Sequence, residues 1–388
     1  MRTCRRLRTR LALTAAVALV LAGCGSAGGG GAGAPGSQAP STAAPATAAP
    51  VATTSTAPCQ PAPLEERAAA VLALGIGDAT TADAPLAARV AALGVGGVIL
   101  LGLNVVDAAQ VKALVEGMRQ RAPRQLLVSV DEEGGRVSRL RPILGPTPSA
   151  RVLGQRPLPE IADVAAERGR ALRELGFDLV LAPVVDAEGG PAGGAIGDRA
   201  FAATPPEAGA RAGAFVEGLR RAGMAGTAKH FPGQGGLADS HDGEVVSNAS
   251  MPEVEALAEA GFRPSLAAGV PAVMMSHVTF RALGSRPASL EPAAYRLLRS
   301  MGFDGVAVTD AVGMSAILDQ WSLPEAAVLA VIAGADLVLA TPADRAAAMR
   351  DAIVAAVNDG RLPQSRLDEA VRRVVTLRGE APATMVCG

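Results

Sequence analysis

The chain has 388 residues, 49% of them hydrophobic, and its 36 Lys and Arg residues nearly balance its 37 Asp and Glu residues. This length allows one large domain of barrel size or two ordinary domains. The formal net charge of −1, with no basic run beyond the N-terminus, argues against a nucleic acid partner.

Residues 1–23 are predicted to form a lipoprotein signal peptide. Five arginines between positions 2 and 10 make a basic region, and the apolar stretch at 11–21 is too short to span a membrane as a mature helix. The segment ends in Leu-Ala-Gly-Cys24, which resembles the bacterial lipoprotein signal and implies lipid attachment to Cys24. We therefore expect an exported protein at the outer face of the cytoplasmic membrane, attached through its lipid anchor only. The alternative is an ordinary secretory signal followed by a coincidental cysteine.

Residues 24–60 consist largely of Gly, Ala, Pro, Ser and Thr. Such a segment cannot bury enough apolar surface to offset the entropy of ordering, so we predict a disordered tether. The folded domain is expected over residues 61–388, with Cys59 and Cys387 at its two ends. A pair of cysteines in an exported protein suggests a disulfide, and a closed barrel would place its first and last elements side by side.

Short apolar runs alternate with amphipathic segments throughout the predicted domain. Eight continuous apolar runs predict buried strands, at residues 71–76, 97–101, 126–130, 179–184, 224–228, 272–276, 306–309 and 337–340. Apolar residues at three- and four-residue spacing predict helices, at residues 105–121, 205–221, 252–268 and 342–357. This alternation predicts an α/β fold, a single TIM-type (β/α)8 barrel. An open doubly wound sheet is the alternative, although no Gly-x-Gly-x-x-Gly follows the first strand.

Polar side chains follow five consecutive predicted strands, where a barrel enzyme carries its chemistry. In chain order these residues are Asp131 with Arg139 soon after, Asp186 with Arg199 in the following loop, Lys229 and His230, His277, and Asp310. Because the residues that precede them should be buried, solubility alone does not explain five such strand ends. We expect these polar groups to meet at the carboxyl-terminal end of the barrel.

The most informative segment is Lys229-His230-Phe-Pro-Gly-Gln-Gly, followed three residues later by Asp239-Ser-His241. It holds two of the three histidines of the chain. An imidazole with its usual pKa of about 6.5 can give and take a proton near neutrality. A nearby Asp239 would stabilise the protonated ring, and the glycines would let the loop close over a bound ligand.

These segments resemble the landmarks of glycoside hydrolase family 3, and more narrowly of its single-domain β-N-acetylglucosaminidase branch. The matching segments are Lys229-His-Phe-Pro-Gly, Asp239-Ser-His241, Asp131-x-Glu-Gly-Gly-Arg136, Ile196-Gly-Asp-Arg199 and Gly305-Val-Ala-Val-Thr-Asp310. They occur in family order and span essentially the whole predicted domain. The resemblance implies a carbohydrate substrate, and neither a cofactor nor a metal.

The resemblance also assigns roles to single residues. Asp310 matches the nucleophile, His241 an unusual general acid/base on a mobile loop, and Asp239 the partner that orients the imidazole. The residues that match contacts to the terminal sugar are Asp131, Arg139, Arg199, Lys229 and His230. A retaining glycosidase needs a nucleophilic carboxylate and a proton donor that later acts as a base, and both are usually carboxyl groups.

Two positions depart from the family pattern, and several roles have structural alternatives. Gln234 stands where the family usually has His, and Ala311 follows the nucleophile where a second acidic residue is common. Asp310 could instead cap a helix, Asp239 a turn, and His241 could be an ordinary exposed loop residue. His277 is expected to support the barrel rather than perform chemistry. Glu132 and Glu133 are neighbours on a strand and should point to opposite faces.

The resemblance implies a retaining exo-β-N-acetylglucosaminidase that removes terminal N-acetylglucosamine from peptidoglycan fragments through a covalent glycosyl-aspartate, in cell-wall recycling or turnover. A β-glucosidase of the same family is an alternative, although those enzymes generally draw their acid/base from an additional domain. A histidine acid/base also leaves phosphorolysis open. A lipoprotein that only binds cell-wall sugars would require loss of the nucleophile or the proton donor, and both are present.

Overall fold

The computed structural model describes residues 59–190, 192–341 and 343–387. The predicted signal peptide, the lipidation site Cys24 and all but the last two residues of the predicted tether lie outside the described residues, so they stay predictions. The described residues belong to a compact unit that begins at Ala57. Among them, no helix combines the length and the apolar character needed to cross a bilayer.

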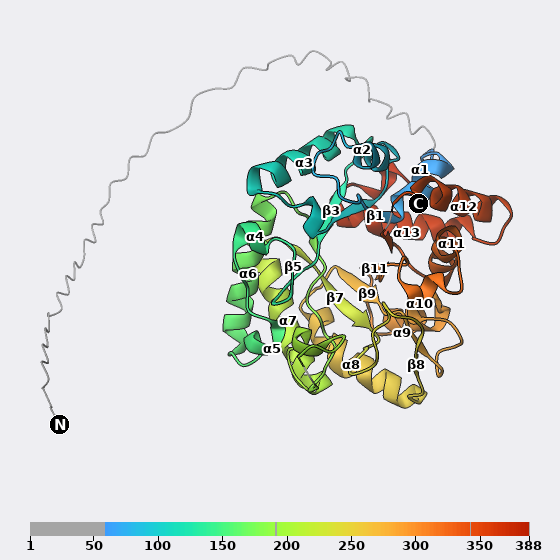
Figure 1. Cartoon of the computed structure of the whole chain (residues 1–388). Coiled ribbons are helices and arrows are strands. Elements are labelled where there is room, and N and C mark those ends of the chain that lie inside the picture. The colour runs from blue at the N-terminus through green and yellow to red at the C-terminus, as the bar shows by residue number, and fades with distance from the viewer. Residues whose placement is uncertain (1–58, 191, 342, 388) are drawn as a thin grey trace, which may run out of the picture. The chain divides into compact units, whose positions relative to one another are not determined.

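Eight parallel strands form the central sheet (Figure 1). In spatial order they are β11 (Val306–Thr309), β9 (Ala272–Met275), β7 (Ala225–Phe231), β6 (Leu179–Val180), β3 (Leu127–Val130), β2 (Gly97–Leu100), β1 (Leu72–Gly75) and β12 (Val338–Ala340). A parallel bridge between Val308 and Leu337 joins the two outer strands. The sheet is therefore a nearly closed barrel, which confirms the predicted fold and excludes the open doubly wound sheet.

Helices surround this barrel (Figure 1). The four that the sequence predicts are α3 (Ala108–Arg121), α7 (Pro205–Arg221), α8 (Met251–Ala267) and α12 (Ala346–Asn358). The others are α1 (Leu64–Ala70), α2 (Pro85–Ala92), α4 (Arg141–Leu144), α5 (Ala150–Leu153), α6 (Leu158–Glu174), α9 (Pro292–Ser300), α10 (Ser315–Leu318), α11 (Leu323–Ala333) and α13 (Gln364–Leu377). Helix α3 begins three residues later than predicted because the Asp107 side chain accepts a hydrogen bond from Gln110 N and caps it.

Each of the eight predicted apolar runs overlaps a barrel strand, since both faces of a parallel barrel are covered. Strand β7 extends three residues beyond its predicted run, to Phe231. The run at 179–184 forms a strand of only two residues. Pro183 lacks an N–H to donate, but a bridge between Val184 and Lys229 continues the pairing beyond it. Four short strands lie outside the barrel: β4 (Glu132–Gly134), β5 (Val137–Ser138), β8 (Val245–Ser247) and β10 (Val278–Phe280).

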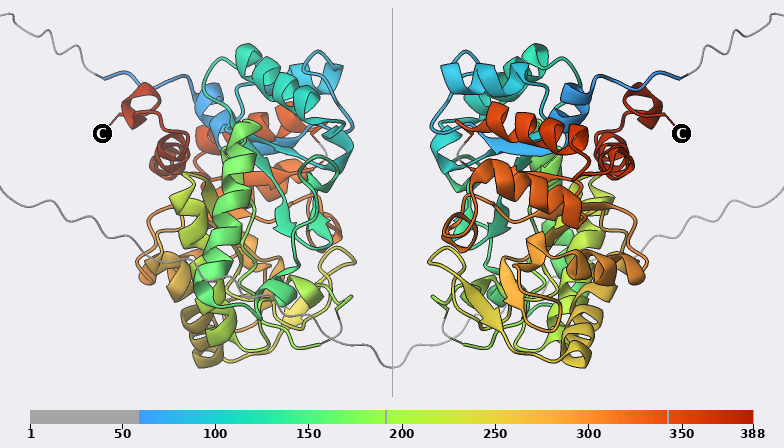
Figure 2. Two further views of the ribbon diagram at one scale, coloured as in Figure 1. Left: turned by 90° about the vertical axis from the view of Figure 1, so that its left-hand side faces the viewer. Right: turned by 90° about the vertical axis from the view of Figure 1, so that its right-hand side faces the viewer.

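The apolar core has two layers. One cluster packs the strands against the helices. The other fills the barrel with alternate strand residues, among them Ile99, Leu127 and Met274. Val374 and Leu377 of α13 join this inner cluster, so α13 packs against the amino-terminal end of the barrel. The side views place α13 (dark red) at the opposite end from the β4–β5 hairpin (teal) (Figure 2).

The two ends of the described chain lie together. A disulfide joins Cys59 to Cys387, the pair that the sequence suggests, with a Cα–Cα distance of 5.7 Å. Three residues further in, Ala62 N donates a hydrogen bond to Met385 O at 2.9 Å. The amino-terminal segment that precedes α1 is thus bound to the segment that follows α13.

Candidate active site

A cavity of about 290 Å³ lies at the carboxyl-terminal ends of the barrel strands, where (β/α)8 enzymes carry out their chemistry. Its polar lining consists of Asp131, Glu133, Arg139, Arg199, Lys229, His230, His241 and Asp310. The barrel residues Ile99, Leu181, Met274 and Leu339 contribute its apolar lining. Every catalytic and sugar-binding residue that the sequence predicts therefore lines this cavity, except Asp239, which contacts His241.

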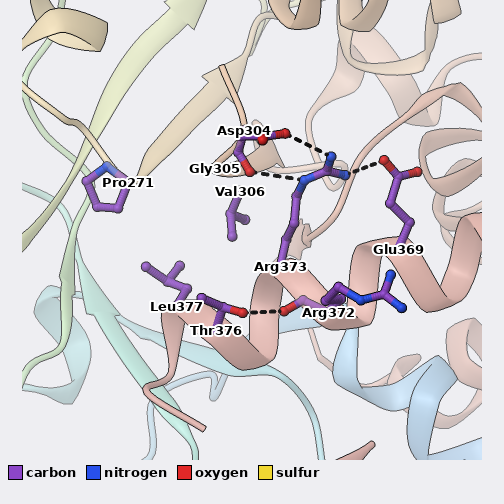
Figure 3. A pocket seen from close by; sticks show the side chains of 9 residues that line it. All are labelled: Pro271, Asp304, Gly305, Val306, Glu369, Arg372, Arg373, Thr376 and Leu377. Atoms are coloured by element: carbon purple, nitrogen blue, oxygen red, sulfur yellow. Dashed lines mark hydrogen bonds and ion pairs between the residues drawn. The ribbon is translucent and has the colours of Figure 1, made fainter. Parts of the chain in front are cut away.

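A larger cavity, of about 530 Å³, lies at the other end of the barrel between β11 and α13 (Figure 3). Three of its charged residues are engaged with one another, since Arg373 donates to Glu369 Oε1 at 2.7 Å and to the backbone oxygen of Asp304 at 3.1 Å. The rest of its lining includes the apolar residues Val306 and Leu377. None of the predicted site residues reaches this cavity, so the smaller one is the candidate active site.

Asp310 directly follows β11, and its backbone N bonds Met275 O of the neighbouring strand β9 at 3.0 Å. Its Oδ1 accepts a hydrogen bond from Ala311 N at 2.7 Å, and its Oδ2 lies 3.9 Å from His230 Nε2. Burial alone would raise the pKa of Asp310, but the adjacent His230 and the Ala311 N–H hold it below its usual value. The carboxylate is therefore ionised, as a nucleophile must be. It does not cap the next helix, since α10 is preceded by Met314.

Lys229 and His230 are consecutive residues of β7, yet both line the cavity. In a regular strand they would point to opposite faces. The register of β7 against β9 shifts at this point, since Lys229 pairs with Met274 and Phe231 with Met275. This extra residue is a β-bulge, which turns two successive side chains toward one site.

A charged network forms one wall of the cavity. Lys229 Nζ lies 2.8 Å from Asp131 Oδ1 and 2.6 Å from Glu133 Oε1. Arg199 binds both oxygens of Glu133, at 2.7 and 2.9 Å. Burial opposes every charge here, but Lys229 and Arg199 lower the pKa of Glu133 far below its usual range, and Asp131 and Glu133 raise that of Lys229. The groups therefore stay charged and hold each other in place.

Glu132 lies on the other face of the same short strand, as adjacent residues should. Its carboxylate accepts hydrogen bonds from Ser138 Oγ at 2.5 Å and Leu140 N at 3.0 Å, and lies 3.4 Å from Arg168 Nη2. The prediction that the two glutamates point to opposite faces is thus confirmed.

Arg139 contributes to the cavity lining and, within the described residues, keeps one side-chain nitrogen unpaired. Its Nε is buried and has no hydrogen-bond partner among the described residues, while its side chain belongs to the lining. Buried donors in native proteins are nearly always paired.

His241 and Asp239 form a pair on the loop that follows β7. The ring Nδ1 of His241 lies 2.7 Å from Asp239 Oδ1, and the same oxygen accepts from His241 N at 2.9 Å. The two side chains are 68% and 42% exposed. Partial burial would raise the pKa of Asp239, but the two hydrogen bonds from His241 lower it overall. Asp239 therefore stays ionised and binds the Nδ1 side of the ring, which leaves Nε2 available to the cavity.

Two residues near the cavity, Glu133 and Asp186, have roles that the sequence alone did not reveal, and a third, His277, has the supporting role that was predicted. Glu133 lies two residues after Asp131, and this spacing on a strand places both side chains on one face. The buried Asp186 accepts a hydrogen bond from His230 at the ring Nδ1. His277 is buried behind the site, with its ring bound to Ser289 Oγ and to Ala311 O. Burial is the main cause that lowers its pKa, in keeping with a supporting role.

Within the part of the chain that the structure describes, no three His, Cys, Asp or Glu side chains gather in a geometry that could hold a metal ion. The cavity instead offers fixed charges, an ionised carboxylate and an imidazole. This set can bind hydroxyl groups and carry out proton transfer and nucleophilic attack.

The family model described as "Glycosyl hydrolase family 3 N terminal domain" matches residues 65–377. The chain belongs to glycoside hydrolase family 3. This family 3 enzyme is 40% identical over 340 residues to the beta-hexosaminidase LpqI of Mycobacterium tuberculosis, an alignment that covers 83% of this chain and 84% of that protein. It is 39% identical over 254 residues to the beta-hexosaminidase of Tolumonas auensis, which covers 63% and 75% of the two chains.

Solved structures agree with this assignment. The family 3 enzyme superposes on the LpqI structure with a TM-score of 0.73 at 36% identity, over 82% of this chain and 94% of that one. It superposes on a family 3 β-N-acetylglucosaminidase from a Paenibacillus species with a TM-score of 0.77 at 33% identity, over 84% and 64% of the two chains. The family resemblance that the sequence shows is confirmed.

Proposed function

We propose that this glycoside hydrolase is a retaining exo-β-N-acetylglucosaminidase that acts on peptidoglycan fragments. The observation that carries the proposal is the meeting of Asp310 and His241 at one cavity, from the seventh strand and from the loop after the fifth. The amino-sugar substrate is supported by relatives that bear the name beta-hexosaminidase.

In the first step, Asp310 Oδ2 attacks the anomeric carbon while His241 gives a proton to the departing glycosidic oxygen. This forms a glycosyl-aspartate and releases the rest of the glycan. In the second step, His241 takes a proton from water, which attacks the anomeric carbon and frees Asp310. Two inversions leave the configuration of the sugar unchanged. Asp239 stabilises the imidazolium that exists before the first step and forms again in the second.

The cavity suits one terminal sugar. Its volume of about 290 Å³ lies at the small end of ligand pockets, which span roughly 300–1,000 Å³. Asp131 can accept hydrogen bonds from sugar hydroxyls, and Lys229 and Arg139 can donate them. These contacts support removal of a single residue from a chain end rather than internal cleavage.

The natural location of the enzyme is part of the proposal. Cleavage before Cys24 and lipidation of its thiol would hold the enzyme at the outer face of the membrane, where cell-wall fragments occur. Radiolabelled palmitate should enter the wild-type protein in its host and should be absent from Cys24→Ala. Equal labelling of both proteins would exclude this anchor.

The decisive assay is release of p-nitrophenol from its β-N-acetylglucosaminide. Asp310→Asn should remove activity while the protein stays folded, and full activity in this variant would refute the nucleophile. The matching glucoside separates a β-glucosidase from an amino-sugar hydrolase. Product analysis in phosphate buffer separates free sugar from a glycosyl phosphate, and binding without turnover would indicate a lipoprotein that only recognises sugars. Mass spectrometry of treated muropeptides should then show loss of a terminal N-acetylhexosamine.

A further inference from the structure

Asp186 occupies a position that links two parts of the site. Its carboxylate is completely buried, and it accepts hydrogen bonds on both oxygens. Oδ2 accepts from His230 at the backbone N, at 3.1 Å, and at the ring Nδ1, at 2.7 Å. Oδ1 accepts from the backbone N of Gln234 at 2.5 Å. One carboxylate thus holds a cavity-lining imidazole and the start of the loop that follows it.

The bond to Asp186 determines what His230 presents to the cavity. With Nδ1 bound to Asp186, Nε2 is the atom on the side of Asp310, 3.9 Å from its Oδ2. Rotation of the ring by half a turn would break the bond to Asp186 and place a carbon toward the nucleophile. Asp186 therefore selects the orientation in which a ring nitrogen faces the reacting carboxylate.

Gln234 carries this restraint into the loop. It is buried, and its side-chain Nε2 donates a hydrogen bond to Ala238 O at 3.2 Å, just before Asp239 and His241. Further along the loop, Ser240 O accepts a hydrogen bond from Ala316 N of α10 at 3.4 Å. The loop is thus attached at its base and near its middle, although the His241 side chain is largely exposed.

We infer that Asp186 is a positioning residue that couples His230 to the loop bearing Asp239 and His241, and that Gln234 passes the restraint to that loop. This inference rests on the proposed function for its consequence in catalysis, in which His241 transfers the proton. The pair Asp186 and Gln234 is called the loop latch below.

The carboxylate is essential to the latch because donors face both of its oxygens. An asparagine at position 186 has one acceptor oxygen and one NH₂ group. Whichever way the amide turns, its NH₂ faces an N–H of either His230 or Gln234, and one buried donor loses its partner. Asp186→Asn should therefore release one side of the latch without changing the size of the side chain.

The first test uses nuclear magnetic resonance and needs no turnover. The chain has only three histidines, so the imidazole signals can be assigned with a His230→Gln variant. In the wild type, the Nδ1 proton of His230 should exchange slowly with water, and in Asp186→Asn this protection should be lost. The control is Asp178→Asn, a carboxylate at the opposite end of β6 that bonds Arg119 and Val128 N. Unchanged protection in Asp186→Asn would overturn the inference, whether or not the protein cleaves amino sugars.

The second test is kinetic. Asp186→Asn should lower kcat/KM about 10²-fold, the scale of a small misplacement in an active site, while Asp178→Asn should stay within about twofold of wild type. Gln234→Ala should lower kcat and leave KM nearly unchanged, because the sugar contacts are intact. If the wild-type protein has no glycosidase activity, the proposed function is refuted. The magnetic resonance measurement on His230 would still test the positioning role of Asp186.

Amide hydrogen exchange tests separately whether Gln234 restrains the loop. This test remains available if Asp186→Asn does not fold. Amide hydrogen exchange of residues 235–243 should be faster in Gln234→Ala than in the wild type. Faster exchange together with a lower kcat supports the latch. Exchange that is unchanged in this segment overturns it.

Discussion

Glu133 and its neighbour Glu132 provide a matched pair of substitutions. Both are buried glutamates on β4, but only Glu133 lines the cavity. Glu133→Gln keeps the shape of the side chain but removes its negative charge. That charge pairs with Lys229 at 2.6 Å and with Arg199 through two hydrogen bonds. Loss of one partner from a buried ion pair costs about 3–5 kcal/mol. We take the lower limit, about 3 kcal/mol, because the amide oxygen can still accept from one of the two cations.

A loss of about 3 kcal/mol corresponds to a fall in Tm of roughly 4 °C for a domain of this size, because the entropy of unfolding is about 2.1 cal/mol/K per residue. Glu132→Gln should also lower Tm, because Glu132 accepts from Ser138 and Leu140 and lies near Arg168. Stability therefore does not separate the two variants, but substrate binding does. The kcat/KM for the N-acetylglucosaminide should fall about 10²-fold in Glu133→Gln, mainly through KM, and by less than about threefold in Glu132→Gln. Equal losses of kcat/KM in the two variants would refute the assignment of Glu133 to the wall of the sugar site.

Three further predictions test separate parts of the structure. Replacement of Cys59 and Cys387 by serine should lower the free energy of unfolding by about 2–4 kcal/mol, measured by denaturant titration, with kcat unchanged, because the disulfide lies among the chain ends. The folded-state pKa of Asp310 is lower than the unfolded value, so its ionisation adds stability above the unfolded pKa of about 3.9, and this contribution is lost as the pH falls through the folded value. The difference in Tm between wild type and Asp310→Asn should accordingly shrink from pH 6 to pH 3, and a constant difference would contradict the shift. Asp239→Asn should lower kcat by about 10²–10⁴ for alkyl leaving groups and far less for dinitrophenolate, which needs little protonation; an equal loss for both would show that Asp239 does not serve proton transfer.

The fold and most of the site could be predicted because their signals are local. Continuous apolar runs identify the strands of a parallel barrel, and charged residues directly after such runs identify the end that carries chemistry. Asp310 and Asp131 illustrate this, since each follows a strand and each lines the cavity. The limits of short elements were less accessible, as the two-residue strand β6 shows.

The residues that sequence reasoning missed depend on register and on tertiary contact. Successive side chains of a strand point to opposite faces, which separates Glu132 from Glu133. The same alternation could have placed Glu133 beside Asp131. This alternation would wrongly separate Lys229 from His230, which face one cavity at the point where the register of β7 shifts. The role of Asp186 arises from donors at positions 230 and 234, more than forty residues away in the chain. Only the folded structure brings these groups together.

The site divides into a rigid part and an exposed part, and this division follows from the chemistry. Lys229 and Glu133 are only 3% and 4% exposed, and such buried charges are tolerated only when neighbours hold them in fixed geometry. They can therefore bind the sugar without reorganisation. The proton donor has a different task, because it must meet both the departing oxygen and the incoming water. In the proposed mechanism, His241 performs this task from a loop that also carries Asp239, which keeps the imidazole and the carboxylate paired. Substitutions in the buried network should accordingly change stability and KM together, whereas those in the exposed pair should change kcat with little effect on stability.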